Sequence, residues 1–130
     1  MLPINITELL EHHRIESNRI EYKQGWNPTA IYHTICAFAN DFENLGGGYI
    51  VVGVEEENGM AKRPVLGVPE EQLDKIQQQM VGFNNKFVPY YQPQTTVEEV
   101  DGKKVLVIRG GKRSEPSLYH SDRCYFVGRS

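Results

Sequence analysis

The segment at residues 94–110 constrains the fold more than any other part of the sequence, because it contains two strand-like runs joined by a two-residue turn. The run QTTVEEV is followed by Asp101 and Gly102 and then by the run KKVLVIRG. Asp-Gly between two alternating runs favours a tight turn with positive φ at both central residues, and such a turn joins antiparallel strands. The sequence therefore predicts an antiparallel hairpin, and the rest of the fold must accommodate it.

The other predicted elements alternate between helices and strands. Further strands are predicted at residues 18–24, 49–54, 64–68 and 123–129, and the strand at 64–68 is expected to pair with 49–54 through a turn near Asn58 and Gly59. Helices are predicted at about residues 7–13, from Pro28 and from Pro69. This order predicts an α+β fold, with a mixed, largely antiparallel sheet of five to six strands and three helices packed on it.

Length and composition predict a single domain. The chain has 130 residues, of which 39% are hydrophobic and 24% charged, as in ordinary soluble globular proteins. No apolar run is long enough to cross a membrane and the N-terminus does not read as a signal peptide, so a cytoplasmic location is expected, with Cys36 and Cys124 as reduced thiols. Because the chain stops directly after a predicted strand, we expect residues 1–130 to be the N-terminal part of a longer protein.

Charge is distributed unevenly along the chain. The net charge of −3 argues against tight nonspecific binding of nucleic acid, which depends on Lys and Arg. However, residues 101–130 carry 7 basic and 3 acidic side chains, whereas residues 1–100 carry 7 basic and 14 acidic ones. The basic end predicts a phosphate-contact patch, with Tyr119, Tyr125 and Phe126 available for stacking on bases. The alternative is that Lys103 and Lys104 are ordinary turn residues of the hairpin and that Tyr125 or Phe126 belongs to the core.

Three consecutive glycines, residues 46–48, raise the possibility of a phosphate-binding loop. In the P-loop and in the dinucleotide fingerprint the glycines follow a strand and open a helix, whereas here they follow a predicted helix and open a strand. We therefore expect them to end the helix with positive φ and to bring the strand close to it. The alternative is that exposed amides of this loop bind an anion.

Acidic residues occur on or beside two of the predicted strands. Glu16 and Glu21 are five residues apart, and Glu55 and Glu56 follow the run at 49–54. If the two strands pair as neighbours, three carboxylates would meet at one end of the sheet, where they could hold a divalent cation that positions a water against a phosphodiester. The alternative is that residues 55–57 form a solvated turn with no specific role.

Four motifs follow one another across nearly the whole chain. They are ESNRIEYK at residues 16–23, ICAFAND at 35–41, GGGYIVVGVEEENG at 46–59 with VLGV after it, and YFVGRS at 125–130. Together they resemble the Schlafen AlbA-like domain, also called the divergent AAA domain, of bacterial transcriptional regulators. The resemblance implies an α+β domain, usually N-terminal, that binds nucleic acid. The family also carries an ATP-binding label, although the chain has no P-loop or Walker-type acidic strand.

The resemblance also implies where a nuclease site would lie. In animal Schlafen proteins a related pair of lobes forms an RNA-cleaving site from two glutamates and an aspartate. Carried over motif by motif, these acids fall on Glu16, Glu21 and Glu56, with Glu55 as a less favoured third acid. The third acid is thus a glutamate in place of aspartate, and a single lobe lacks the other half of the clamp. We therefore favour binding over catalysis, with Mg²⁺ or Mn²⁺ as the metal if the site is catalytic.

These inferences predict a nucleic-acid-binding domain of a bacterial transcriptional regulator that contacts mainly the phosphate backbone. The predicted binding residues are Lys23, Arg109, Lys112, Arg113, Arg123 and Arg129. One alternative is a metal-dependent endoribonuclease that uses Glu16, Glu21 and Glu56. Another is a module that forms a homodimer or senses a ligand without contacting nucleic acid.

Overall fold

The computed structural model describes residues 6, 10, 14–15, 18–40, 47–88, 92–111 and 125–126. Residues 6 and 10 are helical. The elements follow in the order β1 (Arg14–Ile15), β2 (Asn18–Lys23), α2 (Pro28–Asn40), β3 (Gly48–Val52), β4 (Glu56–Glu57), β5 (Met60–Ala61), α3 (Glu70–Asn84), β6 (Phe87–Val88), β7 (Gln94–Val100), β8 (Lys103–Gly110) and β9 (Tyr125–Phe126).

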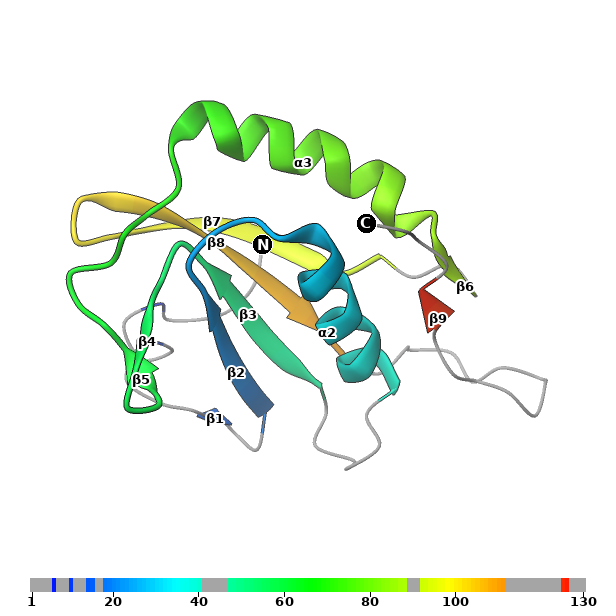
Figure 1. The fold of residues 1–130 in the computed structure, drawn as a ribbon, viewed down its shortest axis with the longest axis horizontal. Helices are drawn as coiled ribbons and strands as arrows, with labels where there is room; N and C mark the ends of the chain where they lie inside the picture. The colour runs from blue at the N-terminus through cyan, green and yellow to red at the C-terminus, as the bar shows by residue number, and fades with distance from the viewer. Residues whose placement is uncertain are drawn as a thin grey trace.

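The main sheet has five strands in the order β1-β2-β3-β8-β7 (Figure 1). Strands β2 and β3 are parallel, and the other neighbours in this sheet are antiparallel. Because α2 lies between β2 and β3 in the chain, these three elements form a βαβ unit. Two short pairs lie outside the main sheet, β4 with β5 and β6 with β9.

The predicted α+β class and the mixed, largely antiparallel sheet are confirmed, but the numbers of elements differ from the prediction. The described residues contain two complete helices, and the helix predicted at about residues 7–13 falls mostly outside them. The two short strand pairs were not predicted. Within the described residues, no helix is both long enough and apolar enough to span a membrane.

The strand predicted at residues 64–68 is wrong. The turn at Asn58 and Gly59 instead joins β4 to β5, and residues 64–68 contain no strand. Pro64 has no N–H to donate, and the amides that follow make isolated long-range contacts, from Val65 to the Asp101 carboxylate and from Val68 to the Lys104 carbonyl. Val65 and Val68 are buried whereas Leu66 is exposed, a mixture of buried and exposed residues that a strand would also show, so the sequence pattern could not distinguish this loop from a strand.

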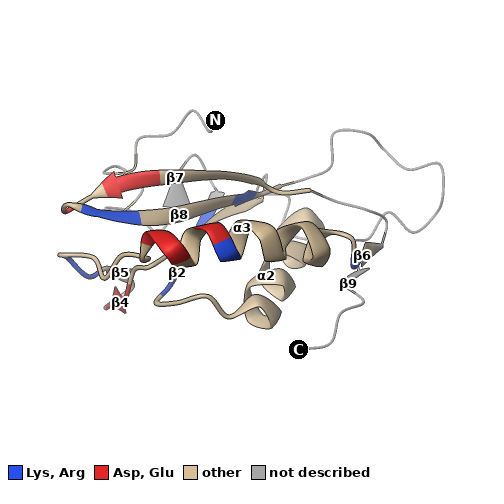
Figure 2. Ribbon diagram, turned by 90° about the horizontal axis from the view of Figure 1, so that it is seen from above, with Lys and Arg blue, Asp and Glu red and all other residues tan. Residues whose placement is uncertain are grey.

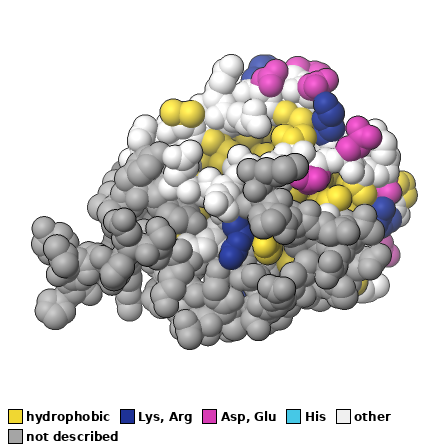
Figure 3. Space-filling model, turned by 180° about the vertical axis from the view of Figure 1, so that it is seen from behind, with side chains coloured by type: hydrophobic (Ala, Val, Ile, Leu, Met, Phe, Trp, Pro, Cys, Tyr) yellow, Lys and Arg dark blue, Asp and Glu magenta, His cyan; other side chains and the backbone are white. Residues whose placement is uncertain are grey.

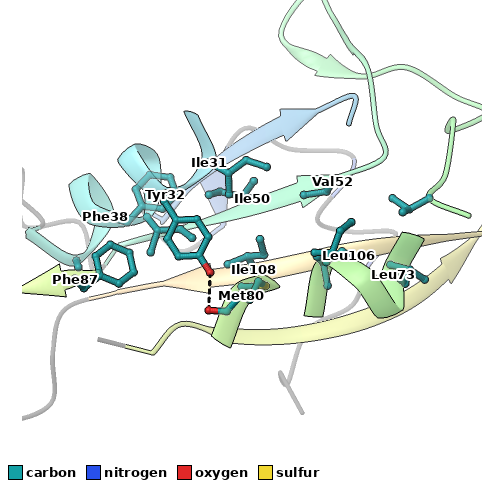
Figure 4. Close-up of a cluster of buried hydrophobic side chains, with 14 residues drawn as sticks. Ile31, Tyr32, Phe38, Ile50, Val52, Leu73, Met80, Phe87, Leu106 and Ile108 are labelled. Atoms are coloured by element: carbon teal, nitrogen blue, oxygen red, sulfur yellow. Dashed lines mark hydrogen bonds between the residues drawn. The ribbon is translucent and has the colours of Figure 1, made fainter. Parts of the chain in front are cut away.

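Both described helices pack on the same face of the main sheet, which Figure 2 shows in side view. Helix α2 begins at the predicted Pro28, and the Asn27 side chain accepts a hydrogen bond from the Ala30 amide at 3.4 Å. The core between helices and sheet is drawn in Figure 4, and its fully or nearly fully buried members include Ile31, Tyr32, Ile35, Phe38, Ile50, Val52, Leu73, Ile76, Met80, Leu106 and Ile108. We call this side of the sheet the helix face.

The opposite side of the sheet, which we call the second face, carries its own buried apolar cluster. Its members are Leu10, Ile20, Tyr22, Val51, Val54, Val65, Val100, Val105 and Val107. Leu10 is 2% exposed and Ile6 packs against the same cluster, so residues before β1 cover part of this face. Because both faces are apolar, the polar side chains of the central strands are confined to the ends and edges of the sheet.

A notch between two strands holds helix α2 close to the sheet. Gly48 and Gly110 are directly paired across β3 and β8, and both contact Phe38 of α2. A Cβ atom on Gly48 would lie 2.6 Å from the Phe38 ring and 2.8 Å from the Arg19 carbonyl oxygen, so a larger residue does not fit. The expected role of the glycine run, a close approach of strand to helix, is confirmed at Gly48, and Gly47 has the expected positive φ of 104°.

Candidate nucleic-acid interface

Strand β2 presents its polar and apolar side chains to opposite faces of the sheet. Residues paired in register point to the same face, and Glu21 pairs with Ile50 of the helix-face core. Lys23, two residues on, points to the same side, and its Nζ lies 3.8 Å from the Glu21 carboxylate. The side chains of Glu21 and Lys23 are 40% and 30% exposed. The first predicted acid that the structure describes is therefore a partly exposed, ion-paired carboxylate on the helix face.

Glu55 and Glu56, which follow β3, lie beyond the end of the sheet at which β2 ends with Lys23. The Lys23 carbonyl accepts hydrogen bonds from Gly53 and Val54 (2.7 and 3.1 Å), which fixes the exit of β3 beside the end of β2. Beyond this point the β4–β5 pair holds Glu56 exposed to solvent. Glu55 faces Lys62, with 3.4 Å between the carboxylate and the ammonium nitrogen. The strands that carry Glu21 and precede Glu56 are therefore neighbours, as the three-carboxylate hypothesis requires.

Tyr22 indicates where Glu56 lies. Its side chain points to the second face and is 8% exposed. Burial raises the pKa of the Tyr22 phenol to about 12, and the negative charge of Glu56 adds to the rise. Glu56 therefore lies close to a residue whose side chain points away from that of Glu21. The structure places the two acids at one end of the sheet, but it gives no sign of a shared site.

A complete metal site cannot be built from the described acids. No group of three Asp, Glu, His or Cys side chains in the described part of the chain is arranged to hold a metal ion. Glu16 lies outside the described residues, so the Glu16, Glu21 and Glu56 cluster, with its Mg²⁺ or Mn²⁺, stays a prediction.

Arg109 lies on the second face, far from Lys23. It pairs with Tyr49 at the start of β3, and its guanidinium carbon lies 4.9 Å from the centre of the Tyr49 ring. One guanidinium N–H donates to the Gly110 carbonyl at 3.0 Å. Lys23 instead lies beside Val52 at the other end of β3 and points to the helix face. The structure therefore does not bring these two predicted binding residues together.

The four remaining predicted binding residues, Lys112, Arg113, Arg123 and Arg129, lie outside the described residues and stay predictions. Their positions in the chain nevertheless relate them to Arg109. Two follow directly after Gly111, and the other two flank β9 within three residues. Strand β8 runs from the hairpin turn toward the side of the molecule where β6 and β9 lie (Figure 1). The sequence neighbours of the four cations are therefore at the same end of the sheet as Arg109, although β9 lies beside α2 on the helix side and Arg109 points to the second face.

Other cations are neutralised by acids near the hairpin turn. Arg63 donates two hydrogen bonds of 2.7 Å to the Asp101 carboxylate, and Lys104 contacts Glu70 at 2.9 Å. The Arg63 hydrogen bonds and then the Val65 amide lower the pKa of Asp101 to about 2. Figure 3, which shows the second face, accordingly has described Lys and Arg side chains interspersed with acids at its upper right, while a separate basic group lies near the middle.

Sequence reasoning assigned no role to a groove on the helix side of the molecule. It is lined by Trp26, Gln72, Lys75, Ile76 and Gln79 and has a volume of about 360 Å³. Its helical residues recur at intervals of three and four and so share one surface of α3, but the approach of Trp26 to that surface is a tertiary contact that the sequence does not show. The available signal was that Trp26 is the single tryptophan of the chain and sits between a strand and a helix.

Comparisons with known proteins agree with this fold. The model of the family described as Schlafen, AlbA_2 matches residues 16–129. A similar solved structure is the N-terminal domain of a RecG-related protein from Nitrosomonas europaea, whose name refers to an ATP-dependent DNA helicase. The two sequences are 26% identical and the TM-score is 0.58, and the match covers 90% of this chain and 78% of that one. The DIP2311 protein from Corynebacterium diphtheriae has the same fold, with 20% identity and a TM-score of 0.52, and the match covers 94% of this chain but only 30% of that one. No curated protein matches the sequence significantly.

Proposed function

The chain belongs to the Schlafen AlbA_2 family, and from this premise we propose that it is a nucleic-acid-binding domain of a bacterial transcriptional regulator. The RecG-related neighbour, named after a DNA helicase, supports a role connected with nucleic acid. The family alone does not locate a binding surface, so the proposal depends on where the cations lie.

The observation that carries the proposal is the position of Arg109. It lies on the second face over Tyr49, at the end of β8 from which the most basic segment of the chain continues. Stacking on the ring and the hydrogen bond to Gly110 hold the guanidinium in place, and a guanidinium is the group best suited to bind phosphate oxygens through paired N–H donors. Lys112 and Arg113 follow Arg109 closely in the chain and would add charge beside it, and Arg123 and Arg129, which in the chain flank β9 on the helix side of the same end, would extend the surface, giving contacts mainly to the sugar-phosphate backbone.

Lys23 has a different place in the proposal. Its ion pair with Glu21, its opposite face and its position at the other end of β3 separate it from Arg109. A strand bound at Arg109 would reach Lys23 only by passing around the edge of the sheet. We therefore centre the binding surface on Arg109 and treat Lys23 as a second, independent contact.

Salt-dependent binding tests the proposal. Fluorescence anisotropy with labelled single- and double-stranded DNA and RNA would be measured between about 50 and 200 mM salt, where phosphate contacts produce a steep linear fall of log K with log salt concentration. Arg109→Gln is expected to weaken binding to all sequences and to reduce the magnitude of the salt slope by about 1. Lys103→Gln is the matched control, because it removes one charge from the other end of the same strand.

Each other outcome has a defined meaning. If Arg109→Gln behaves as Lys103→Gln does, the binding surface is not at Arg109 and the proposal fails. Absence of binding to any nucleic acid even at low salt, together with a concentration-dependent dimer in sedimentation, would favour the homodimer or sensor alternative. Cleavage of the RNA in the presence of Mg²⁺ or Mn²⁺ that Glu21→Gln abolishes would replace the proposal by the endoribonuclease.

A further inference from the structure

The groove on the helix side lies between a loop and one surface of α3. Trp26 belongs to residues 24–27, the loop that connects β2 to α2, which Figure 1 shows on the same side of the sheet as α3. The remaining lining residues come from α3, and they are Gln72, Lys75, Ile76 and Gln79. The volume of about 360 Å³ is within the range of small-molecule pockets, about 300–1,000 Å³.

The indole of Trp26 is held in a fixed orientation at this groove. Its Nε1 donates a hydrogen bond of 2.7 Å to the Gln79 side-chain oxygen. Its ring also meets the buried Tyr32 ring in a T-shaped contact, with centroids 6.3 Å apart and an angle of 84° between the planes. A T-shaped contact uses at most one of the two faces of the indole. Trp26 is partly buried against the helix-face core but also lines the groove, and there a flat ring can stack on it at little further cost in side-chain entropy.

The polar groups of the groove are mainly hydrogen-bond donors. After accepting from Trp26, the Gln79 amide still has two N–H donors, and Gln72 offers another amide. Lys75 is exposed and, within the described residues, has no ion pair with an acid. The acids on the first turns of α3, Glu70, Glu71 and Asp74, are not among the lining residues. The one charge that lines the groove is therefore positive.

We propose that this groove binds a nucleotide unit. The base would stack on Trp26, ring nitrogens and carbonyl groups of the base would accept hydrogen bonds from Gln72 and Gln79, and Lys75 would contact the phosphate. The unit can be a free nucleotide or one residue of a single strand, and for the strand the inference rests on the function proposed above. The groove is on the helix side, whereas Arg109 is on the second face, so the two sites can be tested separately.

Trp26 itself provides the measurement, because it is the single tryptophan of the chain. AMP, UMP, ATP and single-stranded pentanucleotides would be titrated while the intrinsic fluorescence and the Trp26 indole N–H resonance are recorded. We expect saturable quenching and a shift of that resonance. Lys75→Gln should weaken the interaction by about tenfold, the usual effect of losing one charge-assisted hydrogen bond, and Lys103→Gln should leave it unchanged. Tighter binding of the pentanucleotide than of the mononucleotides would identify a strand as the source, and equal binding a free nucleotide.

The inference is overturned if no saturable change occurs up to about 10 mM nucleotide, far above the dissociation constants expected for such contacts. It is also overturned if Lys75→Gln and Lys103→Gln have equal effects. Polymer binding that depends on Arg109 but leaves the Trp26 signals unchanged rejects the groove and keeps the proposed function. Nucleotide binding in the groove without any polymer binding rejects the proposed function and keeps the groove.

Discussion

Tyr22 connects the packing of the second face with the acids at the end of the sheet. Its phenol is buried among apolar side chains, and Glu56 lies close enough to affect its ionisation. Both effects disfavour the charged phenolate, burial by desolvation and Glu56 by repulsion between like charges. The neutral phenol therefore stabilises the fold below the ordinary tyrosine pKa of 10.0, and this stability is lost as the pH rises toward about 12.

Replacing Glu56 tests this arrangement. Glu56→Gln should lower the pKa of Tyr22 but leave it above 10.0, because burial is the larger cause. The measurement is an NMR titration of ring-labelled tyrosine, with Tyr22→Phe to assign the resonance. Glu57→Gln removes the same charge from the next residue and should shift the pKa less. An equal shift in both variants would mean that Glu56 is no closer to the phenol than its neighbour.

The alternation of apolar and polar side chains along β2 was predicted correctly from the sequence, but the face of the sheet on which each set lies was not. Ile20 and Tyr22 lie on one face of β2, and Glu21 and Lys23 on the other, as the pattern indicated. Which face the helices would cover depends on the partners of β2, and those are not encoded in six consecutive residues. The separation of Lys23 from Arg109 follows from the same missing information, because it requires the register of β2, β3 and β8 together.

The turn of the β7–β8 hairpin reverses the chain and also holds the loop that follows β5. Asp101 and Gly102 have the positive φ angles, 54° and 72°, that the turn prediction requires. The Asp101 carboxylate also binds Arg63 and the Val65 amide, and so attaches the loop after β5 to the hairpin. The hairpin was predictable because its signal is local, whereas these contacts join residues 36 and 38 positions apart.

Acid should remove the contribution of this contact. The pKa of Asp101 is lowered to about 2, so its stabilising effect is complete above the ordinary value of 3.8 and is lost as the pH falls toward 2. Asp101→Asn, which tolerates the same backbone conformation, should lower the melting temperature at about pH 7, and the difference from the unsubstituted chain should shrink toward pH 2. Circular dichroism at a series of pH values measures it. Asp74→Asn, on the exposed surface of α3, is the control. If the melting temperature of Asp101→Asn is lower by the same amount at every pH, the carboxylate charge is not involved.

For the whole molecule, one polar contact ties the two helices together inside an otherwise apolar layer. The Tyr32 hydroxyl on α2 donates to the Asn84 side-chain oxygen on α3 at 2.8 Å. The Met80 carbonyl lies 3.4 Å from the same hydroxyl, and this contact is the dashed line in Figure 4. Asn84 is the single buried polar residue among those described, with 7% exposure. The packing of α2 against α3 therefore includes a buried amide whose oxygen is hydrogen-bonded.

Removing one partner should cost more than its hydrogen bond alone. Tyr32→Phe leaves the Asn84 oxygen without this donor, and the free energy of unfolding should fall by about 1–3 kcal/mol. The double variant Tyr32→Phe with Asn84→Leu should be less destabilised than the sum of the single variants, because no buried polar group then lacks a partner. Urea denaturation provides the values. Additive effects in the cycle would show that the two side chains are not coupled.

The notch at Gly48 and Gly110 determines where α2 rests. The edge of the Phe38 ring packs against the backbone of the two glycines, so steric fit positions the helix. Steric contacts, unlike electrostatic ones, are not screened by salt. Trp26 lies in the loop two residues before the first residue of α2, so the position of α2 also determines the position of Trp26. Raising the ionic strength should therefore release a polyanion from the surface around Arg109 without changing the position of Trp26. The concentration of salt is thus a simple physical means of observing the two regions one at a time.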